Sequence, residues 1–148
     1  CIATVFTAGS GARTGKDKTL LVDLWGAVRL IRRCADSGPS RFVMVSALKA
    51  ADPDGVEGGI KPYLVAKWAA DEVLARSNLD YTILRPGRLT DAPGTGKLEV
   101  AESLGNRTGE ITREDVAAAI TECLRDPSTV GKVYELINGT TPIDRAFG

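Results

Sequence analysis

The sequence contains no histidine and carries no net charge, and both absences narrow the possible functions. Without histidine, the protein lacks the commonest general base and the commonest zinc ligand, so no metal site is predicted. Lys and Arg together number 19, as do Asp and Glu, so nothing attracts nucleic acid or an anionic membrane. No apolar run approaches the roughly 18 residues that a membrane span requires. We therefore expect no nucleic-acid or membrane partner.

Cysteine is scarce and shows no functional spacing. The three cysteines, Cys1, Cys34 and Cys123, are odd in number and lie far apart, so they form no C-x-x-C motif. Reduced cysteines in a cytoplasmic protein are the simplest interpretation of this pattern.

Two glycine-rich loops lack the phosphate-binding patterns that they partly resemble. In the loop that begins at Gly9, the dinucleotide pattern G-x-G-x-x-G requires glycine where Thr14 stands, and the Walker pattern requires Ser or Thr where Asp17 stands. The loop at 94–98 fails in the same way. Two interpretations remain for the first loop. It is either a tight turn in which glycine adopts positive φ, or a strand end, Thr7-Ala8-Gly9, over which a cofactor lies.

What the sequence does contain is a regular alternation of strand and helix patterns. With 148 residues and 43% hydrophobic residues, the chain is long enough for a single domain over 1–148. Predicted strands span 2–7, 41–47, 80–84, 110–111 and 133–138, and predicted helices span 20–35, 63–77 and 112–124. Thr112 is the expected N-cap of the last helix, and the segment from Arg88 to Arg107 is expected to be irregular.

Buried-type strands that alternate with helices predict the α/β class, with a parallel sheet and helices on both faces. In such sheets, ligands bind beyond the carboxyl ends of the strands. This rule selects three segments before any chemistry is considered: 7–11, 46–49 and 85–88.

Ser46, Tyr63 and Lys67 form a candidate reaction centre in that region. Tyr63 and Lys67 are four residues apart at the start of a predicted helix and so share one face, while Ser46 ends the preceding strand. An ammonium next to the phenol is expected to lower its pKa, so that it can exchange a proton with a substrate oxygen that the serine hydroxyl holds. The alternative is an ordinary helix start with a solvated lysine, and position alone leaves the two interpretations equal.

Three segments carry a resemblance to a known family: 41–46 (RFVMVS), 80–87 (DYTILRPG) and 111–117 (ITREDVA). With weaker similarity over 4–11 and 63–67, the chain resembles an atypical short-chain dehydrogenase/reductase. The most similar group is the small NAD(P)H-binding, nitrogen-regulator-like proteins, often labelled sugar epimerases or flavin reductases. The resemblance implies a partial Rossmann-type, doubly wound sheet, NAD or NADP as cofactor, and a small-molecule substrate.

The resemblance also implies roles for individual residues. Ser46 would orient the substrate, Tyr63 would be the acid/base, and Lys67 would bond the nicotinamide ribose and tune Tyr63. Ala8 and Gly9 would lie against the adenosine side of the cofactor, and Pro86 and Gly87 would approach the nicotinamide. Asp23 and Gly26 would serve helix packing rather than chemistry.

The family's opening strand, its G-x-x-G-x-x-G loop and the following βα units have no counterpart in this sequence, which begins at what would be the fourth strand. Residues 2–7 are therefore expected to form an uncovered edge strand, which a second copy of the chain would cover in a homodimer or higher oligomer. Two functions remain open. One is an NAD(P)-dependent oxidoreductase or epimerase, as a truncated form with weak or no activity. The other is a non-catalytic cofactor-sensing or protein-interaction module.

Overall fold

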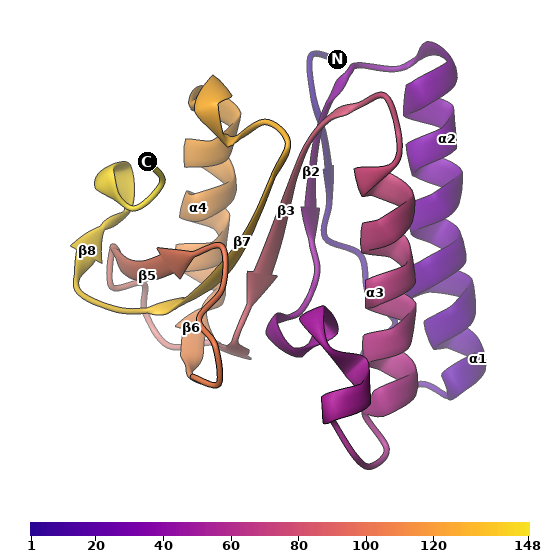
Figure 1. The fold of residues 1–148 in the computed structure, drawn as a ribbon, viewed down its shortest axis with the longest axis horizontal. Coiled ribbons are helices and arrows are strands. Elements are labelled where there is room, and N and C mark those ends of the chain that lie inside the picture. The colour runs from indigo at the N-terminus through magenta and orange to yellow at the C-terminus, as the bar shows by residue number, and fades with distance from the viewer.

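The computed structural model describes residues 1–148 as a mostly parallel sheet of six strands, in the order β1-β2-β3-β7-β5-β8 (Figure 1). The four parallel strands are β1 (Thr4–Phe6), β2 (Arg41–Val45), β3 (Asp80–Pro86) and β7 (Lys132–Asn138). The remaining two, β5 (Lys97–Ala101) and β8 (Thr141–Pro142), run antiparallel to their neighbours β7 and β5. The predicted α/β class is thus confirmed, with antiparallel strands added at one edge.

One long helical segment and two further helices flank the sheet. The long segment runs through α1 (Lys16–Lys18), η1 (Thr19–Gly26) and α2 (Ala27–Ser37), and the others are α3 (Lys61–Ala75) and α4 (Arg113–Arg125). Short turns of tighter helix are η2 (Leu48–Ala51), η3 (Pro53–Gly55), η4 (Pro127–Thr129) and η5 (Ile143–Arg145). None of the helices combines the length and apolarity that a membrane span requires.

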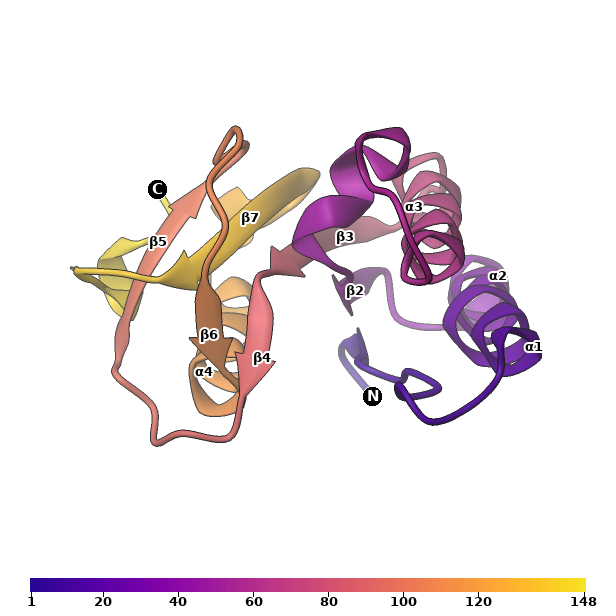
Figure 2. The same cartoon turned by 90° about the horizontal axis from the view of Figure 1, so that it is seen from below.

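Alternation along β2 explains why both faces of the sheet are covered (Figure 2). Phe42 and Met44 point to the face on which α2 and α3 pack, in a core that also contains Ile31, Ala70 and Leu74. Val43 points to the opposite face, where it joins α4 in a second core. Successive side chains of a strand point to opposite faces, so a continuous apolar run is the pattern of a strand buried on both sides. The doubly wound arrangement is therefore confirmed.

Helix α4 begins where the sequence predicts. The side chain of Thr112 accepts a hydrogen bond from the backbone N–H of Asp115 at 3.0 Å, which satisfies one of the free donors of the first turn. The expected N-cap is thus confirmed.

The segment from Arg88 to Arg107 is more ordered than predicted. It contains β4 (Arg88–Thr90), which pairs in parallel with β6 (Glu110–Thr112), and all of β5. Strand β4 is short and mostly exposed, so it carries little of the apolar pattern by which a strand is recognised in a sequence. Strand β5 does alternate polar and apolar residues, with Leu98 fully buried, and the sequence interpretation missed this signal. The two glycine-rich loops contain tight turns, because Gly11 and Gly96 adopt φ of 80° and 70°.

Strand β1 lies at the edge of the sheet and pairs only with β2. Ile2 and Val5 are 94% and 39% exposed there. The predicted apolar edge is therefore present in this chain.

Candidate active site

A cavity of about 610 Å³ opens beyond the carboxyl ends of β2 and β3. It contains Ser46 from the end of β2, Tyr63 from the first turn of α3, and Pro86 and Gly87 from the end of β3. Its other walls come from the turn at 47–49, from Ile60 and Leu64, and from the segments 88–89 and 108–110. The structure thus brings together four of the residues that the sequence singled out, at the edge of the sheet where ligands are expected.

The hydroxyl of Tyr63 is available to a ligand, because it makes no hydrogen bond to any protein group while its ring lines the cavity. Burial, together with the negative charges of Asp23 and Asp71, raises the pKa of Tyr63 to about 12. The prediction that Lys67 lowers this pKa is therefore wrong for this chain. Tyr63 holds its proton at neutral pH and is suited to donating it.

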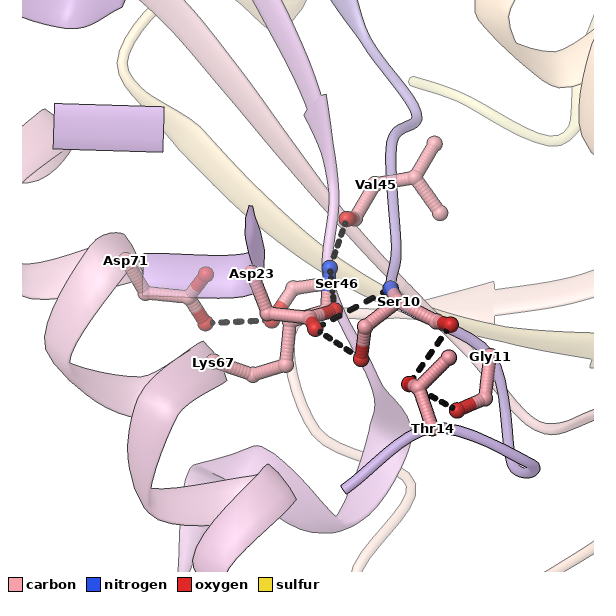
Figure 3. A network of polar contacts seen from close by, with 8 residues as sticks. All are labelled: Ser10, Gly11, Thr14, Asp23, Val45, Ser46, Lys67 and Asp71. Carbon is pink, nitrogen blue, oxygen red and sulfur yellow. Dashed lines mark hydrogen bonds and ion pairs between the residues drawn. The ribbon is translucent and has the colours of Figure 1, made fainter. Parts of the chain in front are cut away.

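The contacts of Lys67 explain why it does not lower the pKa of Tyr63. Its ammonium donates to the carbonyl oxygen of Val45 at 3.3 Å and forms an ion pair with Asp23 Oδ1 at 3.7 Å (Figure 3). It also lies 5.8 Å from the centre of the Tyr63 ring. Burial lowers the pKa of Lys67, whereas the carboxylates of Asp23 and Asp71 raise it. Lys67 does not line the cavity, and the carboxylate of Asp23 balances its charge.

The sequence interpretation assigned Asp23 to helix packing, and its contacts with Ser10 and Lys67 make it a functional candidate as well. Its side chain is fully buried, and its Oδ2 accepts hydrogen bonds from the Ser10 N–H and hydroxyl at 3.1 and 2.8 Å. Its Oδ1 has no hydrogen bond and faces Lys67 (Figure 3). Residues 19–26 wind as a π-helix, a geometry that occurs frequently at functional sites. The available signal was a lone carboxylate within the apolar run from Leu20 to Trp25.

Ser46 is bonded to a second buried carboxylate that the sequence interpretation missed. Its hydroxyl donates to Asp71 Oδ2 at 2.9 Å, and Arg85 Nε donates to the same oxygen at 3.0 Å. Burial raises the pKa of Asp71, while Arg85 and Ser46 act in the opposite direction. Because the Ser46 proton is directed inward, only lone pairs remain on its oxygen for a ligand. Asp71 follows Lys67 by one helical turn, and that spacing was the available signal.

Two other predicted contacts lie apart from the cavity. Ala8 and Gly9 are exposed in the loop after β1 and do not line it. Gly9 instead covers the buried carboxylate of Asp23, since a Cβ there would come within 3.2 Å of Oδ1.

Gly87 does line the cavity, and packing also requires it to be glycine. A Cβ at this position would collide with the carbonyl oxygen of Gly109 and come within 2.9 Å of the Ile137 side chain. The close approach of β4 to the segment before β6 thus depends on the missing side chain.

The cavity fits the nicotinamide end of a dinucleotide cofactor. It offers an unpartnered phenol at Tyr63, the serine oxygen, and the backbone of Gly87. When bound, that cofactor would supply or accept a hydride. No comparable feature for the pyrophosphate is present, because neither glycine-rich loop has a phosphate-binding pattern.

The fold is that of a Rossmann-type protein, and one cavity beyond the strand ends is lined by both Ser46 and Tyr63. A model of the NAD(P)H-binding family matches residues 2–127. The chain belongs to that family, and the predicted resemblance is confirmed.

Similar proteins extend this comparison. The uncharacterized sugar epimerase YhfK of Bacillus subtilis is 47% identical over 147 residues, which are 99% of this chain and 68% of that protein. A solved Bacillus halodurans structure, whose name assigns it provisionally to the NAD-dependent epimerases/dehydratases, is also 47% identical, with a TM-score of 0.96 over 99% of this chain and 68% of its own. Sanguinarine reductase of Eschscholzia californica is 32% identical over 121 residues, 78% of this chain and 44% of that enzyme. The chain thus spans about two thirds or less of these proteins.

Proposed function

We propose that the protein is an NAD(P)-dependent oxidoreductase that reduces a small carbonyl compound, with Tyr63 as the proton donor. The observation that carries the proposal is the state of Tyr63. Tyr63 lines the cavity, its hydroxyl has no hydrogen-bond partner in the protein, and its pKa is raised to about 12. A group that retains its proton at neutral pH is suited to protonating a carbonyl oxygen as that oxygen gains charge.

The chain's own residues would divide the work as follows. Tyr63 donates its proton to the substrate oxygen, and Ser46 presents lone pairs that accept a hydrogen bond from the hydroxyl of the product. Lys67 acts on the site only indirectly, because its ammonium is held by the Asp23 carboxylate and the Val45 carbonyl oxygen. The reductase name of one relative supports this direction of reaction, whereas the epimerase names of others leave room for a reversible transfer at one carbon.

A second function, cofactor sensing without catalysis, is favoured by one specific feature. The two cations bonded to the buried carboxylates next to the cavity, Lys67 and Arg85, are both neutralised by them. They add no net positive charge that would stabilise a developing oxyanion.

Cofactor binding and turnover separate the two functions. NADH or NADPH is titrated into the chain while the fluorescence of Trp25 and Trp68 and the melting temperature are recorded. Reduction of propanal and glyceraldehyde is then followed by loss of the reduced cofactor. The oxidoreductase proposal expects binding and turnover, sensing expects binding alone, and no binding by either cofactor contradicts both.

Tyr63→Phe tests the proton donor. This variant should lose turnover by about a hundredfold or more while it keeps cofactor affinity. Tyr134→Phe is the matched control, because that ring packs edge-on against Phe147 and does not line the cavity. Equal rates for Tyr63→Phe and the unaltered chain would remove Tyr63 from the mechanism.

A homodimer remains our proposal for the exposed edge at β1. Sedimentation velocity should show a dimer that dissociates when Val5→Lys places a charge on that edge. A monodisperse monomer of the unaltered chain would contradict this.

A further inference from the structure

A second cavity of about 460 Å³ adjoins the first, and the mechanism above does not use it. The two cavities share Leu48, Lys49 and Thr108 in their walls, so they are neighbours at these residues. We call the second one the polar cavity. It is lined by the segments 48–57 and 105–108 and by Glu135 of β7.

Glu135 is the most unusual group in the polar cavity. Its side chain belongs to a central strand and the residue is only 4% exposed, yet it forms no ion pair. One carboxylate oxygen, Oε2, accepts the N–H of Leu104 at 2.5 Å, whereas Oε1 has no hydrogen-bond partner in the protein. Oε1 keeps some accessible surface, so a ligand or solvent in the polar cavity can supply its donor.

The remaining polar groups of this wall narrow the chemistry of that ligand. Three carboxylates, Asp52, Glu57 and Glu135, face two cations, Lys49 and Arg107, and Arg107 is already paired with Glu99 outside the wall. A phosphate or carboxylate ligand would meet an excess of negative charge. A neutral group with several hydroxyls can instead donate to Glu135 and accept from Lys49, which has no carboxylate partner.

We propose that the polar cavity binds the hydroxyl-rich end of the substrate, with Glu135 Oε1 accepting a substrate hydroxyl and Lys49 donating at the junction of the two cavities. The proposal rests on the oxidoreductase function and adds its substrate class, a polyhydroxylated carbonyl compound. Glu135 becomes a specificity-determining residue, because a site built around a carboxylate acceptor discriminates against ligands that lack the matching donor.

Matched pairs of aldehydes test this directly. Glyceraldehyde and propanal have the same carbon chain, as do threose and butanal, and each pair differs only in hydroxyl groups. The unaltered chain should show a higher kcat/KM for the hydroxylated member of each pair. Glu135→Gln keeps an acceptor for the Leu104 N–H but turns a donor toward the cavity. It should lower kcat/KM for threose by about tenfold and leave that for butanal unchanged.

Glu102→Gln is the control, because it removes an exposed carboxylate that lines neither cavity. Glu102→Gln should leave kcat/KM unchanged for both threose and butanal. Equal kcat/KM for the two members of each pair, or an equal loss for both in Glu135→Gln, would overturn the proposal while the oxidoreductase function stood.

A binding measurement tests whether the polar cavity holds a polyol even if no aldehyde is reduced. Xylitol is titrated into the isotopically labelled chain, and the backbone amide signals of residues 105–108 are followed by NMR. Shifts that saturate in the unaltered chain and weaken at least severalfold in Glu135→Gln support the polar cavity as a polyol site. Absence of shifts, or shifts that Glu135→Gln does not alter, would overturn it.

Discussion

The raised pKa of Tyr63 makes stability at alkaline pH a direct measure of the environment of this residue. The ordinary pKa of tyrosine is 10.0, and burial together with Asp23 and Asp71 raises it to about 12. That difference corresponds to about 3 kcal/mol between the two protonation states. Because the folded pKa exceeds the unfolded one, the stabilisation is fully present below about pH 10 and is lost as pH rises through about 12.

The assay compares the unaltered chain with Tyr63→Phe. Free energies of unfolding are measured with urea at several pH values between about 8 and 12. The stability of the unaltered chain relative to Tyr63→Phe should fall by up to about 3 kcal/mol over the alkaline part of this range. Ultraviolet absorbance of phenolate, taken as a difference between the two chains, should show Tyr63 ionising well above the other tyrosines.

Substitutions at two carboxylates test whether nearby negative charge raises the pKa of Tyr63. Asp71→Asn removes a negative charge that raises the pKa of Tyr63, and the absorbance titration should therefore move to lower pH. Glu72→Gln alters the neighbouring helix position, where the carboxylate is paired with Arg76 at the surface, and should leave the titration in place. Ionisation of Tyr63 at or below its ordinary pKa would refute the conclusion that burial and these carboxylates raise its pKa.

Two further predictions concern the framework of the site. Gly87→Ala should destabilise the fold by about 2 kcal/mol in thermal or urea unfolding, because the new Cβ meets Gly109 and Ile137, whereas Gly59→Ala, with open space around it, should cost less than about 1 kcal/mol. Asp115→Asn should cost about 2 kcal/mol at neutral pH. Burial opposes the charge of Asp115, yet bonds from the Thr95 and Gly96 N–H groups outweigh it and lower its pKa to about 2. This stabilisation is present above the unfolded pKa and lost as pH falls through about 2, so unfolding curves of the two chains should converge in acid. A stability difference between Asp115→Asn and the unaltered chain that persists in acid would contradict the lowered pKa of Asp115.

The sheet and its main helices were predictable from the sequence because their apolar patterns are strong. Residues 42–45 are a continuous apolar run, and residues 81–84 are rich in strand-forming side chains, so both segments predict buried strands. Strand β4 escaped prediction because pairing with the distant β6, rather than a local apolar pattern, holds it in place.

The candidate site was only partly predictable, for a different reason. Ser46 and Tyr63 could be found because one ends a strand and the other begins the next helix, so topology alone brings them to one edge. Asp23 lies far from Lys67 in sequence, and the packing of η1 against α3 brings its carboxylate to the ammonium. The pKa of Tyr63 depends on burial and on the balance of these charges, which no spacing in the sequence reveals.

The direction of the Ser46 hydrogen bond separates this site from one in which serine donates to the substrate. Its proton is directed to Asp71 Oδ2, which Arg85 also holds, so Ser46 can accept from a product hydroxyl but cannot donate to a substrate carbonyl. Ser46→Ala should therefore weaken binding of the product alcohol, measured as its inhibition constant, by about tenfold. The same change should lower kcat/KM for carbonyl reduction by less than about tenfold, because Tyr63 alone donates to the carbonyl oxygen. A loss of a hundredfold or more in reduction would show instead that Ser46 turns its proton to the substrate, and that Asp71 carries the compensating proton when it does.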